Sequence, residues 1–356
     1  MNGNLLKSRQ HYEILDGLRG VAAIAVVTFH FMEIIIADYS RNFIGHGFLA
    51  VDFFFCLSGF VMAYAYDNRI ADMGLQAFFT SRIIRLHPLV ILGTVLGLLA
   101  FLFDPFMALP AAYDGWKLTL LFVSSILMIP YPVVAERYFN LFNLNAPSWS
   151  LFWEYIANIL YGVVLWKLSR RLLAALLIPA AAGIIYVSFK AGNLMGGWSG
   201  PTFWQGGARI AYSFLAGMIV FRYNMIIRNK LGFSGLSVLL LAALMMPHFT
   251  YNWLAEALVV LVYFPFLIAL GAGAGMHSTT KAFCNFAGKI SYPLYMTHYV
   301  VMFAFANYLS KYKPDNTHIT WIVVIGLLLL ITFAWLVMAL YDIPVRKYLT
   351  KLRKDF

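Results

Sequence analysis

The chain has 356 residues, of which 62% are hydrophobic and only 12% are charged. Soluble domains carry about 25% charged residues, so this sequence has too little charge to cover a water-facing surface. The composition excludes a soluble globular protein and predicts an integral membrane protein. Its apolar runs are continuous rather than alternating, as in 323–340, which favours membrane helices over a β-barrel.

The net charge is +11, and the basic residues gather at the ends of the apolar runs. This pattern sets the orientation of helices in a lipid bilayer, so it explains the charge without a nucleic-acid partner. The outer side is expected to keep only seven basic residues, among them Arg209. Both termini are expected in the cytoplasm.

In chain order, the apolar runs predict an all-α fold, a single polytopic domain over residues 1–356 with about ten membrane helices. The expected spans lie near 16–37, 48–66, 78–103, 148–168, 172–190, 207–224, 234–249, 251–272, 288–309 and 319–341.

A shorter apolar run at 117–130 is expected to re-enter the membrane without crossing it. A full crossing would place Lys167, Arg170 and Arg171 outside, against the positive-inside bias. Residues 104–147 then form one outer segment that dips back into the protein. Non-helical backbone at that depth is tolerated only inside protein or beside a wet cavity, so the segment points to a site.

Ionisable residues inside the predicted spans are the first candidates for function. Each costs about 2.5–3.5 kcal/mol at the centre of a membrane helix and therefore needs a partner, a cavity or a task. The spans contain six of them: His30, Glu33, Asp52, Glu154, Glu256 and His298.

His30 and Glu154 are expected to meet. A rise of 1.5 Å per residue places them about 12 Å and about 9 Å below the outer ends of their helices. A carboxylate beside a neutral imidazole fixes the histidine tautomer and raises its basicity for general-base work. Two alternatives stay open: a His–Glu hydrogen bond that only joins helices, and Glu33, one turn after His30, as the partner.

Three arginines near the expected cytoplasmic ends form a second group. Arg19 lies eleven residues before His30 and shares its helical face, and Arg82 and Arg85 have the i, i+3 spacing. Guanidinium groups suit phosphate recognition, although arginines at this depth also serve as orientation charges.

Asp52 precedes three phenylalanines, so its carboxylate requires a partner, either a neighbouring helix or the substrate. His298 lies within a span, where a lone histidine is more often a packed donor than a catalyst. Glu256 is expected near a solvated outer end. The histidines show no metal-ligand spacing, so no metal site is expected.

Five motifs in chain order resemble acyltransferase family 3, the integral-membrane bacterial O-acyltransferases that modify surface glycans and some small metabolites. They are Arg19 with His30 after ten intervening residues, VDFFFCLSGF at 51–60, Arg82-Ile83-Ile84-Arg85 followed by Pro88, WSLFWE at 149–154, and SYPLYMTH at 291–298.

The resemblance implies transfer of an acyl group, most often acetyl from acetyl-CoA, to a hydroxyl of a glycan, a lipid-linked saccharide or a small glycoside at the bacterial cytoplasmic membrane. It implies that His30 is catalytic, that Arg19 is its partner on the first helix, and that Arg82 and Arg85 lie near the CoA donor. Other residues are expected to bind substrate or to support the site: Glu33, Asp52, Ser58, Trp149, Ser150, Tyr295 and His298.

Two chemical routes are open, namely direct transfer with His30 as general base, assisted by Glu154, or an acyl-His30 intermediate. Some family members carry a fused C-terminal domain. This sequence ends fifteen residues after Tyr341, and the protein is expected to act without such a domain. The rival function is a proton-coupled transporter or translocator of a lipid-linked glycan, with His30, Glu154 and Asp52 as a proton relay. A proton relay does not explain why the Arg82–Arg85 pair lies at the expected cytoplasmic end, whereas a CoA donor does.

Overall fold

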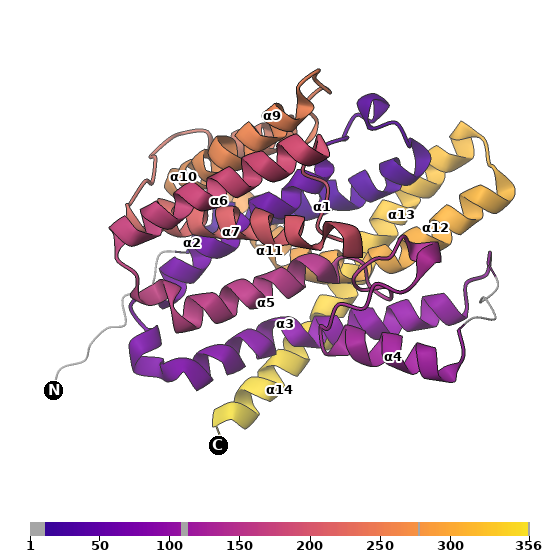
Figure 1. Cartoon of the computed structure of the whole chain (residues 1–356), viewed down its shortest axis with the longest axis horizontal. Coiled ribbons are helices and arrows are strands. Elements are labelled where there is room, and N and C mark those ends of the chain that lie inside the picture. The colour runs from indigo at the N-terminus through magenta and orange to yellow at the C-terminus, as the bar shows by residue number, and fades with distance from the viewer. Residues whose placement is uncertain (1–10, 108–112, 277, 355–356) are drawn as a thin grey trace.

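The computed structural model describes residues 11–107, 113–276 and 278–354, and this part of the chain contains helices and no β-strand. The all-α prediction is confirmed. Most helices run along the long axis of the molecule (Figure 1). The helices are α1 (Glu13–Ile35), α2 (Ala50–Tyr66), α3 (Ile70–Leu102), α4 (Gly115–Ile126), α5 (Ser148–Val163), α6 (Arg170–Ala191), α7 (Phe203–Arg222), α8 (Gly232–Leu244), α9 (Asn252–Leu258), α10 (Phe264–Gly273), α11 (Ser278–Thr297), α12 (Tyr299–Tyr312), α13 (Asn316–Val337) and α14 (Ile343–Lys354).

The protein is a multi-pass membrane protein. Within the described ranges, six helical stretches are long and apolar enough to cross a bilayer: Glu13–Ile35, Gly47–Tyr66, Ile70–Leu102, Arg170–Ala191, Asn252–Gly273 and Asn316–Arg353. The count of ten crossings stays a prediction. Helix α4 has only twelve residues, about 18 Å of helix against a hydrocarbon core of about 30 Å. Its re-entry also stays a prediction.

The centre of the bundle is the contact between α2 and α7, which lie against each other over their whole lengths. Glycines allow this contact. A Cβ atom on Gly59 would come within 1.9 Å of the Phe214 carbonyl oxygen, and one on Gly217 would come as close to that of Cys56. Small residues let membrane helices approach backbone to backbone, where dispersion rather than the hydrophobic effect holds them.

Helix α11 packs along α1 and ends earlier than expected. The predicted span 288–309 is divided, since α11 ends at Thr297 and α12 begins at Tyr299, with His298 at the junction. Pro293 lies one turn before the break. Proline has no N–H for the helical ladder and its ring pushes away the preceding turn, which explains a bend in this helix.

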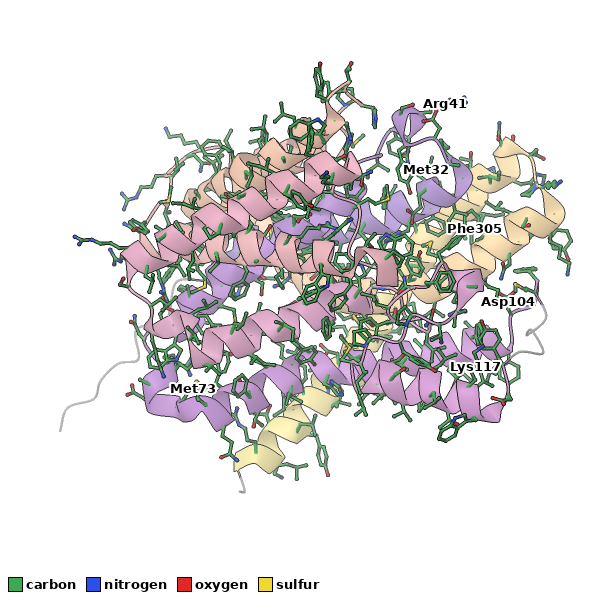
Figure 2. The ribbon with its side chains drawn as sticks, in the orientation of Figure 1. Met32, Arg41, Met73, Asp104, Lys117 and Phe305 are labelled. Carbon is green, nitrogen blue, oxygen red and sulfur yellow. The ribbon has the colours of Figure 1, made fainter. Side chains whose placement is uncertain are left out.

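Helix α3 has 33 residues and is about 50 Å long. Figure 2 shows Met73, in its first turn, and Asp104, just beyond its last, at opposite ends of the molecule. Gly74 has φ +76°, which interrupts the helix near its start. The helix therefore begins eight residues before the expected position, 78, with an added turn outside the apolar run.

Non-helical backbone lies inside the bundle at 140–147, where every residue is buried. Asn145 Nδ2 donates to the Met296 carbonyl at 2.9 Å, and the Leu141 amide donates to the Trp198 carbonyl at 2.9 Å. Gly97 of α3 admits this segment, since a Cβ there would lie 1.8 Å from the Leu144 carbonyl oxygen. As a result α5 begins in the protein interior and not at a membrane surface.

Two of the long helical stretches contain a π-helical turn, at Val259–Tyr263 and at Met338–Asp342. The second turn joins α13 to α14. The chain from Asn316 to Lys354 is therefore one helical rod, and its last part, α14, crosses α3 (Figure 1).

Candidate functional site

A cavity of about 280 Å³ lies among α1, α2, α3, α5, α11 and the turn that joins α13 to α14. We call it the inner cavity. Seven of the residues predicted to form a site line it: Arg19, Ser58, Arg82, Arg85, Ser150, Glu154 and Tyr295. The sequence motifs on different helices therefore meet in space. Lys289, Asp342 and Arg346 also line it, and of these Asp342 and Arg346 were not predicted as site residues.

Glu154 contacts Arg82 and not His30. Its Oε1 lies 3.3 Å from Arg82 Nη2 and accepts a hydrogen bond from Ser58 Oγ at 3.1 Å. The expected His30–Glu154 contact is wrong, because its depth count started at Ser148 as if α5 began at the outer surface. Ser148 is buried in the bundle, so six further residues carry Glu154 past the depth of His30.

Arg19 is held by α11. Its Nε donates to Ser291 Oγ at 3.0 Å, and its Nη2 donates to the Gly288 carbonyl at 2.8 Å and lies 2.8 Å from Asp16 Oδ1. A charge that only oriented the helix would extend toward the lipid headgroups. Here the guanidinium is fixed at the wall of the inner cavity.

A larger cavity, of about 820 Å³, lies on the other side of Tyr295 and is lined by His30 and Glu33. We call it the outer cavity. Aromatic side chains form much of its wall, among them Trp149, Trp198 and Tyr299. Cavities of this size, mostly apolar with a few polar groups, are typical of small-molecule sites.

His30 Nδ1 contacts Glu33 Oε1 one turn further along α1. Tyr39 donates its hydroxyl to Glu33 Oε2 at 3.2 Å. Burial, with the Glu33 carboxylate next to it, raises the pKa of Tyr39 above its ordinary value, so the hydroxyl keeps its proton. Glu33, which the sequence left as the rival partner, is the carboxylate that faces His30.

His298 packs against His30, with ring centroids 5.2 Å apart and planes 21° from parallel. Its Nδ1 lies 3.1 Å from the Leu294 carbonyl, and its Nε2 has no hydrogen-bond partner within the described ranges. The ring is completely buried. Nδ1 must carry a proton to donate to this carbonyl, so the ring of His298 is fixed beside that of His30 by its own helix.

Tyr295 and Val51 line both cavities. The Tyr295 hydroxyl lies 2.7 Å from Ser150 Oγ, which ties α11 to the first turn of α5. The ring of Phe54 meets that of Tyr295 edge-on at 5.8 Å. These side chains form the wall between the inner and the outer cavity.

Asp52 has a partner that the sequence analysis placed wrongly. Arg209 was expected as an outer orientation charge, but it is buried in α7 with Nη2 at 2.6 Å and Nε at 3.1 Å from the Asp52 carboxylate. It also donates to the Phe48 and Gly196 carbonyls. The sequence contained a signal for this pair, since the buried Asp52 carboxylate requires a partner and Arg209 is a cation.

The Asp52–Arg209 pair lies behind the outer cavity. Arg209 borders the cavity and lies 5.2 Å from the ring centroid of Trp149. Asp52 itself borders neither of the two cavities. The pair therefore holds Trp149 in the cavity wall, and Asp52 supports the site from outside it.

Arg137, in the segment after α4, also borders the outer cavity. Its guanidinium lies between the rings of Phe101 and Phe303, at 4.4 Å and 4.0 Å from their centroids. Burial lowers the pKa of Arg137 to about 10, so it stays cationic at neutral pH. It brings a positive charge to a wall that contains many aromatic side chains.

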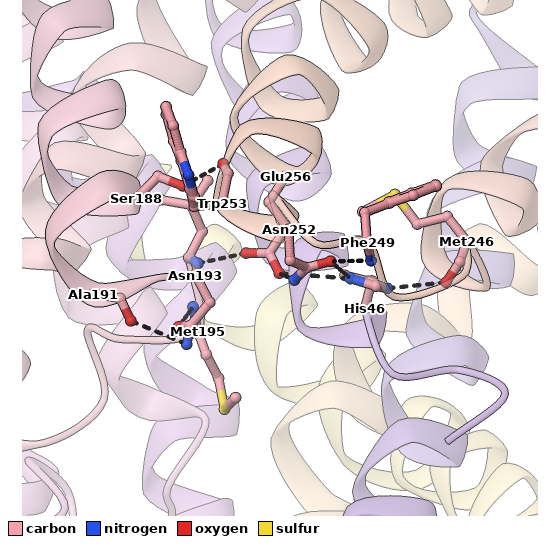
Figure 3. Close-up of polar contacts among 11 residues, drawn as sticks. His46, Ser188, Ala191, Asn193, Met195, Met246, Phe249, Asn252, Trp253 and Glu256 are labelled. Atoms are coloured by element: carbon pink, nitrogen blue, oxygen red, sulfur yellow. Dashed lines mark hydrogen bonds and ion pairs between the residues drawn. The ribbon is translucent and has the colours of Figure 1, made fainter. Parts of the chain in front are cut away.

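A second buried polar cluster, formed by His46, Asn252 and Glu256, is shown in Figure 3. His46 Nε2 lies 2.9 Å from Asn252 Oδ1, Asn252 Nδ2 contacts Glu256, and Glu256 accepts from the Leu194 amide. Glu256 is 1% exposed, so the expectation of a solvated residue is wrong. The cluster joins the loops before α2 and before α7 to helix α9, and we assign it a structural role.

The sequence model of the acyltransferase domain matches residues 12–339 of the chain. Among curated proteins, the chain is 30% identical to "Protein 2 in picA locus" of Rhizobium radiobacter over 185 residues, which is 49% of this chain and 93% of that protein. No solved structure matches the chain.

Two further relatives carry acyltransferase names. The chain is 30% identical to acyltransferase MdmB of Streptomyces mycarofaciens over 179 residues, 48% of this chain and 43% of that protein. It is 30% identical to the putative peptidoglycan O-acetyltransferase YrhL of Bacillus subtilis over 207 residues, 52% of this chain and 30% of that protein. The matches therefore span less than half the length of these two relatives.

Proposed function

Because the chain belongs to the acyltransferase domain family and is a membrane acyltransferase, we propose that it moves an acyl group, acetyl first of all, from acyl-CoA to a hydroxyl of a glycan, a lipid-linked saccharide or a glycoside. The observation that carries this proposal is the pair of cavities on either side of Tyr295. One is rich in arginine, and the other contains a histidine beside a carboxylate.

The inner cavity suits the donor. Arg19, Arg82, Arg85 and Lys289 line it against a single nearby glutamate, Glu154, and the aspartate of the C-terminal rod. Arg82 Nε is buried and has no hydrogen-bond partner in the described part of the chain. A buried donor without an acceptor is costly, so the cavity favours an anionic ligand, as the phosphates of CoA are.

His30 is the proposed catalytic group. With Glu33 accepting from Nδ1–H, Nε2 is the basic nitrogen. In direct transfer, Nε2 takes the proton of the acceptor hydroxyl while the oxygen attacks the thioester carbonyl, and the CoA sulfur leaves and takes up that proton.

The covalent route uses the same geometry. Nε2 attacks the thioester carbonyl, the CoA thiolate leaves, and the acyl group stays on His30 until an acceptor hydroxyl removes it, losing its proton to water or to the leaving nitrogen. Glu33 stabilises the positive charge that develops on the ring in either route. The two routes differ in whether donor and acceptor must be present together.

The outer cavity suits the acceptor. Tyr39, Trp149, Trp198 and Tyr299 present broad amphipathic faces and Arg137 a charge, a combination that holds a polar ring with apolar faces, such as a sugar. The proposed setting is the bacterial cytoplasmic membrane with both termini in the cytoplasm. The donor then enters from the cytoplasm and the acceptor from the outer side.

Purified protein in nanodiscs, incubated with radiolabelled acetyl-CoA and no acceptor, tests this function. CoA release or protein labelling that requires both His30 and the Arg82–Arg85 pair is the expected result. The matched controls, His318→Ala and the Arg170→Ala/Arg171→Ala double variant, remove residues that line neither cavity. Label retained on protein selects the covalent route, and donor binding without release selects direct transfer. Absence of acyl-CoA binding overturns the donor assignment and favours the proton-coupled translocator.

A further inference from the structure

A groove of about 560 Å³ opens beside the inner cavity, between α3 and α14. We call it the α3–α14 groove. Ser81, Ile84 and Arg85 of α3 and Ile343, Arg346, Lys347, Thr350 and Lys351 of α14 line it. The α14 residues recur at intervals of three and four, so one face of that helix is turned toward α3.

The groove carries positive charge with almost no compensation. Four of its eight lining residues are cationic and none is acidic. Arg346 pairs with Asp342 at 3.0 Å. Arg85, Lys347 and Lys351 form no ion pair with any described residue. Like charges on two facing helices repel each other, and a polyanion between them removes this repulsion.

The groove and the inner cavity lie next to each other. Arg85, Ile343 and Arg346 line both of them. A ligand that fills both spaces therefore has an anionic end that lies in the groove and a slender arm that enters the cavity toward Glu154 and Tyr295. Acyl-CoA has this shape, with phosphates on its nucleotide and a thin arm that ends in the thioester.

We propose that the α3–α14 groove binds the nucleotide phosphates of acyl-CoA, with Lys347 and Lys351 of α14 as contacts in addition to Arg85. This inference rests on the proposed function, because it places one end of that donor. The phosphate of an anionic lipid headgroup has the same chemistry. The position of the groove beside the inner cavity favours the nucleotide, since a headgroup has no arm to place there.

The test uses the full chain in nanodiscs of neutral phosphatidylcholine. Calorimetry measures the binding of adenosine 3′,5′-bisphosphate, the nucleotide end of CoA, and steady-state kinetics measures KM for acetyl-CoA. The variant is Lys347→Ala/Lys351→Ala. The control, Lys230→Ala/Arg353→Ala, removes two positive charges from residues that do not line the groove. The Lys347→Arg/Lys351→Arg variant keeps the charge.

We expect the alanine variant to bind the bisphosphate and acetyl-CoA about tenfold more weakly for each lost phosphate contact, with kcat unchanged. The control and the arginine variant are expected to match the unaltered protein. Acetyl-dephospho-CoA, which lacks the 3′-phosphate, is expected to show a smaller difference between the variants.

Two kinds of result overturn the inference. No binding of the bisphosphate by the unaltered protein, or equal binding by the alanine variant, shows that the groove does not hold the nucleotide. Weakened binding of phosphatidylglycerol with unchanged bisphosphate affinity identifies a lipid headgroup as the ligand. Bisphosphate binding that depends on the lysines, in a protein that never turns over acyl-CoA, supports the groove and contradicts the proposed function instead.

Discussion

His30 and Glu33 lie one turn apart on α1, and their side chains meet through Nδ1 and Oε1 at the wall of the outer cavity. The group proposed to react and the carboxylate that orients it therefore come from one helix. Their relative position is set by helix geometry and does not depend on how two helices pack.

Replacing Glu33 by Gln is expected to reduce kcat about 10- to 100-fold, because the ring loses a charged hydrogen-bond partner that stabilises its protonated or acylated form. KM for acetyl-CoA is expected to stay the same, since Glu33 does not line the inner cavity. Steady-state kinetics measures both. An unchanged kcat would contradict the role of Glu33.

Replacing Glu154 by Gln is expected to change KM for acetyl-CoA and not kcat, the opposite of what is expected for Glu33. Arg82 and Ser58 lose their charged acceptor in the inner cavity, so KM for acetyl-CoA changes while turnover at saturating donor is largely kept. The measurement is the same pair of constants. A lower kcat with constant KM would instead support Glu154 as the carboxylate partner of His30.

The thioester must pass Tyr295 to reach His30, and Tyr295→Ala is expected to leave this passage open to water as well. Water then reaches the thioester, so hydrolysis of acetyl-CoA without acceptor is expected to increase. Tyr295→Phe keeps the ring and removes only the hydrogen bond to Ser150, worth about 1 kcal/mol, and is expected to hydrolyse little. Thiol release measured without acceptor compares the two variants, and equal rates would show that Tyr295 is not the barrier.

Arg209→Gln is expected to destabilise the fold by about 3–5 kcal/mol, because it leaves the Asp52 carboxylate buried without a counter-charge. The double variant Asp52→Asn/Arg209→Gln removes both charges and is expected to lose less stability than the single variant. Thermal unfolding in detergent measures which of the two variants is less stable. A double variant less stable than the single one would contradict the argument.

Gly59→Ala is expected to separate α2 from α7, because its Cβ would lie 1.9 Å from the Phe214 carbonyl oxygen. The loss of packing is expected to lower the unfolding temperature strongly. Gly183→Ala in α6 is the matched control, since its Cβ would lie 3.9 Å from the closest atom. Both variants carry the same chemical change, so similar stabilities would contradict the close contact.

The sequence was sufficient to predict an all-α membrane protein and to select Arg19, Ser58, Arg82 and Glu154 as site residues, all of which line the inner cavity. Hydrophobic run length predicts helices because the bilayer sets one length for all of them. The motifs contain most of the ionisable residues that lie within the predicted spans. Such residues are rare in membrane helices and are usually functional, which is why they indicated the site.

The sequence was insufficient for the partners of those charges. The depth of Glu154 depended on where α5 begins, and α5 begins inside the protein only because the buried segment before it crosses Gly97 of α3. The Asp52–Arg209 pair joins helices 157 residues apart, and charge counting alone placed Arg209 at a surface. Such pairings follow from tertiary packing, which a single sequence does not display.

The π-helical turn at Met338–Asp342 sets the direction in which the side chains after it point. A π turn adds one residue to the helical repeat and so turns all that follows by about 100°. Above it, Leu328 and Leu329 of α13 are well exposed; below it, Lys347 and Lys351 face α3. Removing one residue from this turn would restore the α-helical phase and rotate the lysines out of the groove, so a single peptide unit determines which face of the C-terminal helix lines the groove.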